Sequence, residues 1–178
     1  MTALEIVTYP NEILTTPAAP VEGVDSKIAM FMDAMAETMY ASEGVGLAAP
    51  QVGMGRRILT MDVGDGERGG VGLIHLANPE VIEGRGEVIW DEGCLSFPGL
   101  TVQVKRYAEV TVKGLNRENE EVTIETDGLG AVCLQHEIDH LDGIVFVDRL
   151  KGLRRRLAIR EYMRLVREAS RGGARPLA

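Results

Sequence analysis

Two of the chain's three histidines lie four residues apart in CLQHEIDHLDG, residues 133–143, with a glutamate directly after the first. Residues four apart share one face of an α-helix, so His136 and His140 can bind a single metal ion from one side. Glu137 projects about 100° around the helix and can reach a water on the ion without being a ligand. This H-E-x-x-H pattern favours two metal ligands and a general base over two packed histidines beside a surface glutamate.

A catalytic site of this kind needs a third protein ligand and one open position. Cys133 shares the helical face, but it lies about 7.5 Å back along the axis from the expected metal level. Its short thiol also leans toward the helix N-terminus, so we expect Cys133 in the pocket wall. Cys94 in EGCLSFPG is the better candidate, because Gly93 permits close backbone approach and Pro98 fixes the exit of the chain. A buried small apolar side chain is the alternative for Cys94.

Three helices are expected. The His-bearing helix falls in residues 126–143, with Asp127 as its cap and Gly143 as its stop. The first helix, in residues 24–44, is capped by Asp25 or Ser26. Its core-facing stripe is Ile28, Met32, Met35 and Met39. A third helix over residues 151–170 is expected to point Leu153, Leu157 and Leu165 inward and its arginines outward.

Strand-like segments separate the helices. They are RILTMDV, LIHLANPEVIE, GEVIWDEG, LTVQVKR, EVTVKGL and EVTIET. Several alternate apolar and polar residues, as strands of a half-buried antiparallel sheet do. The predicted fold class is α+β, with antiparallel strands packed around a central metal-binding helix and a helix toward each terminus. His75, alone on a strand, is expected to be packed or exposed and not a ligand.

Composition limits the class of protein. The 178 residues are one domain's worth, and 45% of them are hydrophobic. We find no secretory signal, no apolar run long enough for a membrane span and too few cysteines for a disulfide framework. These features predict a cytoplasmic protein that binds neither membrane nor specific DNA. Residues 151–178 hold nine Lys and Arg against two Glu, although the net charge of the chain is −8.

The motifs GVGLAAPQ (44–51), EGCLS (92–96) and QHEIDH (135–140) together resemble those of bacterial peptide deformylases, in the same order and at similar separations. The resemblance covers about residues 4 to 150 and implies one catalytic domain over 1–150, followed by a basic helix and tail over 151–178. It implies removal of the N-formyl group from the first methionine of new polypeptides, with release of formate.

The resemblance also implies residue roles. Cys94, His136 and His140 would be the metal ligands, with Glu137 as the base that takes a proton from the attacking water. The metal would be Fe²⁺, with Zn²⁺ or Ni²⁺ able to substitute. The side-chain amide of Gln51 and the backbone N–H of Leu95 would donate to the oxyanion.

Supporting and substrate residues follow from the same resemblance and from the helical face. Glu92 and Arg106 occupy positions that form a salt bridge in the family. Candidates for an apolar methionine pocket are Val45, Leu129, Val132 and Cys133, with ordinary core packing as the alternative. The backbone of Gly44, Val45 and Gly46 is expected to pair with the peptide as an added strand would.

The sequence also suggests partners and two alternative functions. Formyl-methionyl nascent chains are the expected substrate, and the basic helix could dock on anionic ribosomal RNA. A solvated amphipathic helix is the simpler interpretation. A general zinc metallopeptidase would need a downstream third ligand, for which Asp148 is the nearest acidic candidate. A non-catalytic metal-binding protein would not require Glu137.

Overall fold

The structure is a computed structural model that describes residues 3–64 and 71–171, so the last part of the predicted basic tail lies outside the described residues. Within the described ranges the helices are α1 (Ser26–Ala41), α2 (Gly128–Leu141) and α3 (Gly152–Arg171). Short 3-10 helices are η1 (Glu12–Thr15), η2 (Ala49–Val52) and η3 (Phe146–Arg149). The strands are β1 (Gly46–Ala48), β2 (Ile58–Asp62), β3 (Leu73–Arg85), β4 (Val88–Gly93), β5 (Thr101–Arg106), β6 (Glu109–Leu115) and β7 (Glu121–Asp127).

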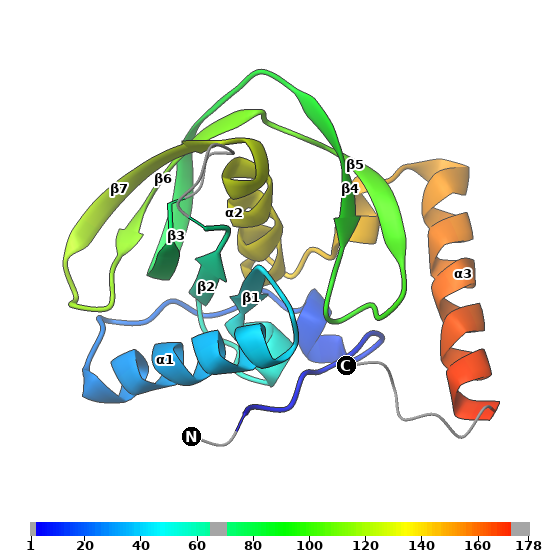
Figure 1. The fold of residues 1–178 in the computed structure, drawn as a ribbon, viewed down its shortest axis with the longest axis horizontal. Coiled ribbons are helices and arrows are strands. Elements are labelled where there is room, and N and C mark those ends of the chain that lie inside the picture. Colours follow the sequence, from blue (N-terminus) through cyan, green and yellow to red (C-terminus); the bar gives the residue numbers. More distant parts are fainter. Residues whose placement is uncertain (1–2, 65–70, 172–178) are drawn as a thin grey trace.

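Two antiparallel sheets enclose the central helix. One sheet has the order β1-β2-β3-β6-β7, and the other is the β4–β5 hairpin. Figure 1 shows α2 between the two sheets, α1 below the larger sheet, and α3 on the far side of the hairpin. The predicted α+β fold around a central His-bearing helix is confirmed.

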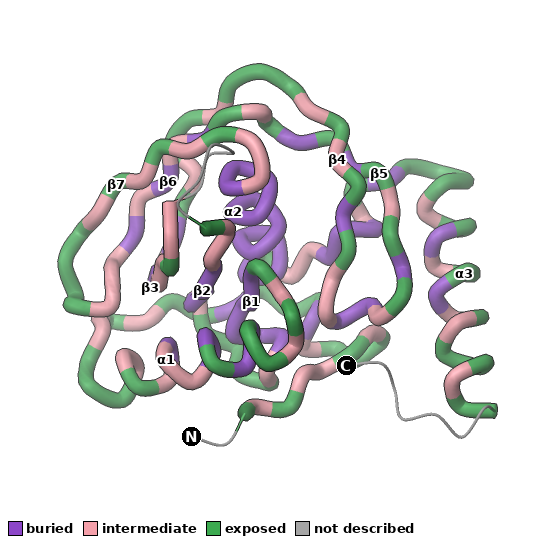
Figure 2. Tube along the Cα trace, viewed as in Figure 1, coloured by how far each residue is buried: buried purple, intermediate pink, exposed green. Residues whose placement is uncertain are grey.

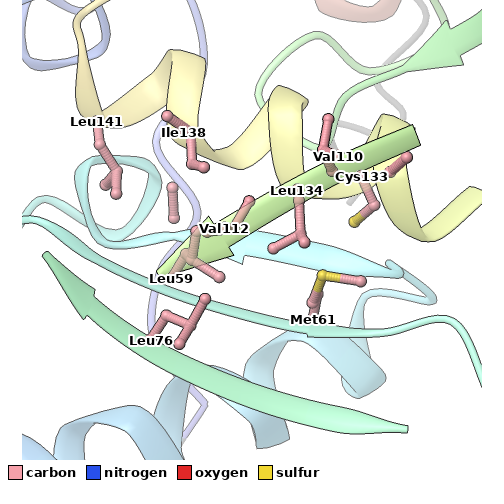
Figure 3. Packing of buried hydrophobic residues seen from close by; sticks show 11 residues of the cluster. Leu59, Met61, Leu76, Val110, Val112, Cys133, Leu134, Ile138 and Leu141 are labelled. Atoms are coloured by element: carbon pink, nitrogen blue, oxygen red, sulfur yellow. The ribbon is translucent and has the colours of Figure 1, made fainter. Parts of the chain in front are cut away.

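Helix α2 is buried along almost its whole length, as Figure 2 shows. Leu134, Ile138 and Leu141 pack against Leu59 and Leu76 of the larger sheet (Figure 3). The opposite side of α2 is polar and faces the hairpin. The helix is therefore held by apolar burial on one side while it presents its chemically active groups on the other.

A clear local cause is seen only at the C-terminal end of α2. Asp127 is the N-cap residue, as predicted, but its side chain makes no capping hydrogen bond. The C-cap is Asp142, and the chain turns away at the next residue, Gly143, where φ is +71°. A Cβ at Gly143 would lie 2.9 Å from backbone atoms of Thr16 and Pro17, so only glycine fits this turn.

The first helix matches its predicted pattern. Asp25 Oδ1 accepts a hydrogen bond of 2.8 Å from the backbone N–H of Ile28, which satisfies one of the free donors at the helix start. Met32, Met35 and Met39 are fully buried against Leu47, Ile58 and Ala77.

The predicted inward face of α3 is wrong at Leu153 and Leu157, whereas Leu165 does pack against the core. Leu153 and Leu157 are 61% and 51% exposed, whereas Ala158 and Tyr162 are buried. Leu165 is only partly buried. The core of this region is aromatic, and Tyr162 packs against the rings of Tyr9 and Phe97. The helix is rotated so that Tyr162 fills this space, which leaves the leucine pair on the surface.

None of the helices within residues 3–64 and 71–171 combines the length and the apolar character needed to cross a lipid bilayer.

The rotation of α3 predicts unequal effects on stability. Tyr162→Ala should lower the free energy of unfolding by about 3–5 kcal/mol, because it removes a buried aromatic ring. Leu157→Ala should change it by less than about 0.5 kcal/mol. Urea denaturation followed by circular dichroism measures both, and similar losses in the two variants would contradict the observed helix face.

His75 predicts a contribution to the pH dependence of stability. Burial lowers its pKa, nearby Asp33 and Glu118 oppose the shift, and Arg117 adds to it. A depressed histidine pKa gives stability that is complete above the unfolded-state value of about 6.5 and is lost as pH falls through it. The free energy of unfolding should therefore fall more steeply between pH 7 and pH 5 in the wild type than in His75→Gln. Parallel curves would show that this histidine does not contribute.

Candidate active site

Three potential metal ligands converge where the end of β4 meets α2. Cys94 follows β4 directly, and its Sγ lies 3.3 Å from His140 Nε2. The rings of His136 and His140 are 5.0 Å apart between centroids. One ligand atom from each of Cys94, His136 and His140 lies within 4.8 Å of the other two. One thiol and two imidazoles at this spacing are a donor set suited to zinc or iron.

Electrostatics around the histidines also fit a cation. Burial lowers the pKa of His140 well below its usual value, so this ring is neutral and its lone pair is available. Burial alone would lower the pKa of His136 too, but Cys94 and Glu92 outweigh it and raise that pKa well above its usual value. The surroundings of His136 thus favour a positive charge, which a cation at Nε2 would supply in place of the second ring proton. His140 Nδ1 and Glu137 Oε2 are both buried without a hydrogen-bond partner among the described residues.

A buried ion pair orients His136. Its Nδ1 lies 2.8 Å from Glu92 Oε2, and Arg106 binds both oxygens of Glu92 at 2.7 and 2.9 Å. Burial would raise the pKa of Glu92, but Arg106 and His136 outweigh it and hold that pKa below its usual value. An ionised carboxylate only accepts hydrogen bonds, so Nδ1 is the donor and Nε2 is left for a metal.

Glu137 lies on α2 next to the ligand cluster, and its carboxyl is a weaker acid than usual. It is only 4% exposed, and burial raises its pKa to about 7, partly opposed by the positive charges of His136 and Arg106. A group with that pKa can both accept and release a proton near neutrality. The β1 backbone passes beside it, and a Cβ at Gly46 would collide with Glu137 Oε1 and with Cys133 Sγ.

Gln51 is fixed beside Cys94 by hydrogen bonds to both ends of its amide. Its Oε1 accepts from the backbone N–H of Ala48 at 2.8 Å, and its Nε2 donates to Ser96 Oγ at 3.2 Å. The same Nε2 lies 3.5 Å from Cys94 Sγ. The donor end of the amide therefore points at the ligand cluster, as a stabiliser of developing negative charge must.

A cavity of about 460 Å³ opens onto these groups. All six predicted substrate-contact residues line it: Gly44, Val45, Gly46, Leu129, Val132 and Cys133. Gln51, Cys94, Leu95, His136 and Glu137 line it as well. Their contact with a substrate stays a prediction.

Sequence reasoning did not identify several residues of the site. Trp90 lines the cavity, and its place two residues before Glu92 on β4 could have indicated a shared strand face. The sequence did not reveal which residue binds the second ring nitrogen of His136. The structure shows that this partner is Glu92. Asp139 and Arg149 extend the ion-pair network, and no local spacing signals that pairing.

Asp148 lies away from the ligand cluster. Its side chain accepts hydrogen bonds from the backbone N–H of Val145 and from Arg155. Asp148 was the nearest acidic candidate for the third ligand of a general zinc metallopeptidase. Its carboxylate instead binds groups at the start of η3 and on α3.

Comparison with known proteins agrees with the predicted resemblance. The family model for polypeptide deformylase matches residues 3–156. The peptide deformylase of Aquifex aeolicus is 45% identical over 163 residues, which are 92% of this chain and 96% of that protein. That of Halothermothrix orenii is 50% identical over 150 residues, or 84% and 95% of the two chains.

Solved structures give the same result. A peptide deformylase from Legionella pneumophila superposes with a TM-score of 0.86 at 41% identity and covers 96% of this chain and 99% of its own. One from Ehrlichia chaffeensis in complex with actinonin gives 0.86 at 39% identity, with 92% and 98% covered. The chain thus belongs to the polypeptide deformylase family, metallo-hydrolases that remove the N-formyl group from new polypeptides.

Proposed function

We propose that this chain carries out the family's hydrolysis at the cavity beside α2, with Cys94, His136 and His140 holding one divalent metal ion. The observation that carries the assignment is the convergence of one sulfur and two ring nitrogens within 4.8 Å. A buried glutamate with a pKa of about 7 lies next to them. Metal binding alone would not require that glutamate.

The proposed cofactor is Fe²⁺, with Zn²⁺ or Ni²⁺ as substitutes. When bound, the cation supplies Lewis acidity, which lowers the pKa of a water molecule and polarises the formyl carbonyl. One thiolate and two neutral imidazoles leave a divalent ion with a formal charge of about +1. A soft sulfur ligand suits iron or zinc and makes the site sensitive to oxidation.

The protein's own groups move the protons. Glu137 takes a proton from the attacking water at a carboxylate oxygen and transfers it to the departing amine nitrogen. The Nε2–H of Gln51 and the backbone N–H of Leu95 donate to the oxygen that becomes negative as water attacks the formyl carbon. Glu92 keeps His136 in one orientation throughout. The products are formate and a free N-terminal amine.

The substrate would be held by one strand edge and an apolar wall. β1 is an edge strand of the larger sheet, so an extended peptide can add to it through backbone hydrogen bonds at residues 44–46. The methionine side chain would fill the space lined by Val45, Leu129, Val132 and Cys133.

The basic helix supports a proposal about partners. Its exposed arginines include Arg156, Arg160 and Arg167, beside the exposed Leu153 and Leu157. We propose that residues 151–178 form a basic segment that docks on ribosomal RNA in the cytoplasm, where formylated chains emerge. Neighbouring Arg164 is instead paired with Glu161 and Glu168 on its own helix.

Two substitutions separate the base from the ligands. Glu137→Gln should retain bound metal but lower formate release from formyl-Met peptides by about 10²–10⁴-fold, because the proton acceptor is lost. Cys94→Ala should lose both metal and formate release. Elemental analysis of protein purified without oxygen and a formate assay measure the two quantities. A Cys94→Ala protein with unchanged metal content and turnover would refute the proposed site.

The ribosome proposal is tested without removing α3, because Tyr162 anchors that helix in the core. Replacing Arg156, Arg160 and Arg167 by Gln should weaken ribosome binding in a sedimentation assay. It should also reduce the slope of log K against log salt by roughly two to three. Formate release from free peptides should not change. The control replaces three exposed cations elsewhere, Arg56, Arg85 and Lys105. Equal losses in both triple variants would mean that the interaction is not localised to α3.

A further inference from the structure

Asp139 is a buried carboxylate with two arginine partners. It lies on α2 three residues after His136 and is 4% exposed. Arg106 Nη1 donates to its Oδ2 at 2.5 Å, and Arg149 Nε donates to the same oxygen at 2.9 Å. A further bond joins Arg149 Nη2 to Asp139 Oδ1. Arg149 therefore binds both oxygens of a carboxylate that Arg106 also contacts.

Arg106 serves two carboxylates at once. Its Nε and Nη2 bind Glu92, which orients His136, while its Nη1 binds Asp139. The side chains of Arg106, Glu92 and Asp139 are at most 5% exposed. A buried charge is costly unless it is paired, and removal of one partner leaves that cost uncompensated. Without Arg149, one guanidinium would have to compensate two buried carboxylates.

We propose that Arg149 is a positioning residue for His136, acting through Asp139, Arg106 and Glu92. By compensating Asp139, it leaves Arg106 free to hold Glu92 through two hydrogen bonds, and Glu92 in turn fixes the His136 ring. Loss of Arg149 draws Arg106 toward Asp139 and loosens the Glu92 clamp. The inference rests on the proposed role of His136 as a metal ligand.

The position of Arg149 allows this effect to be isolated. It comes from η3 and lines a second cavity of about 870 Å³, together with Arg57, Tyr107 and Gln135. Arg149 is absent from the lining of the cavity proposed for substrate. A change at Arg149 should therefore affect metal binding and kcat but leave KM unchanged.

Arg149→Met is compared with Arg155→Met, a control whose side chain is 43% exposed against 45% for Arg149 and whose partner is Asp148. In Arg149→Met, the Kd for Ni²⁺ measured by chelator competition should rise about tenfold, the low end of effects of outer-shell partners. The kcat of the nickel enzyme should fall by a similar factor at constant KM. Arg155→Met should match the wild type in all three, and Arg149→Lys should lie between.

A double-mutant cycle tests the route. Asp139→Asn removes the charge that Arg149 compensates, so adding Arg149→Met to it should change the Kd for Ni²⁺ less than twofold. If Arg149→Met does not fold, Arg149→Lys takes its place in both comparisons, with an expected rise in Kd of less than about tenfold because the positive charge is kept.

Two results would overturn the proposal. One is an Arg149 variant with the Kd and kcat of Arg155→Met, whatever its melting temperature. The other is a full Arg149 effect that persists in the Asp139→Asn background. Failure of the ligand assignment itself is recognised separately, since His136→Ala would then keep the nickel affinity of the wild type.

Discussion

Helix α2 carries a dense set of buried polar side chains, and the need to satisfy them organises the molecule. Burial of a polar group without a hydrogen-bond partner is costly, and burial of a charge costs more. Gln135 is satisfied by the backbone of Tyr107, His136 by Glu92, and Asp139 by two arginines. On α2, the buried atoms without a partner among the described residues belong to Glu137 and His140, which are assigned to proton transfer and metal binding, and His75 Nδ1 on β3 is a third such atom elsewhere.

Apart from Arg149 of η3, the charged partners of α2 come from a separate sheet, so the site depends on how two cores pack together. Glu92, Cys94 and Arg106 all belong to the β4–β5 hairpin or its ends. Behind the hairpin lies the aromatic core shared with α3, whereas α2 packs on the larger sheet. The ligand cluster therefore forms only where these two cores meet, although each is stabilised by its own apolar burial.

Local patterns in the sequence were sufficient to predict the His-bearing helix α2 and the Met-rich buried face of α1. Both depend on helical periodicity, which is set by residues three and four apart. The ion pairs around Glu92 could not be predicted from physics alone, because charged residues far apart in sequence carry no signal of their pairing. The prediction that Leu153 and Leu157 of α3 point inward was wrong for another reason. Its apolar residues form two possible stripes, and the space around Phe97 and Tyr9 selects the one that contains Tyr162.

Gly46 of β1 lies so close to Glu137 that a side chain at position 46 would collide with the carboxylate. The strand edge proposed to receive the peptide and the carboxylate proposed to receive its proton touch, with no space for a single methyl group between them. The strand proposed to bind the peptide and the proposed catalytic carboxylate are therefore in direct contact. A larger residue at position 46 would displace the carboxylate of Glu137, so the absence of a side chain there is part of how the base is placed.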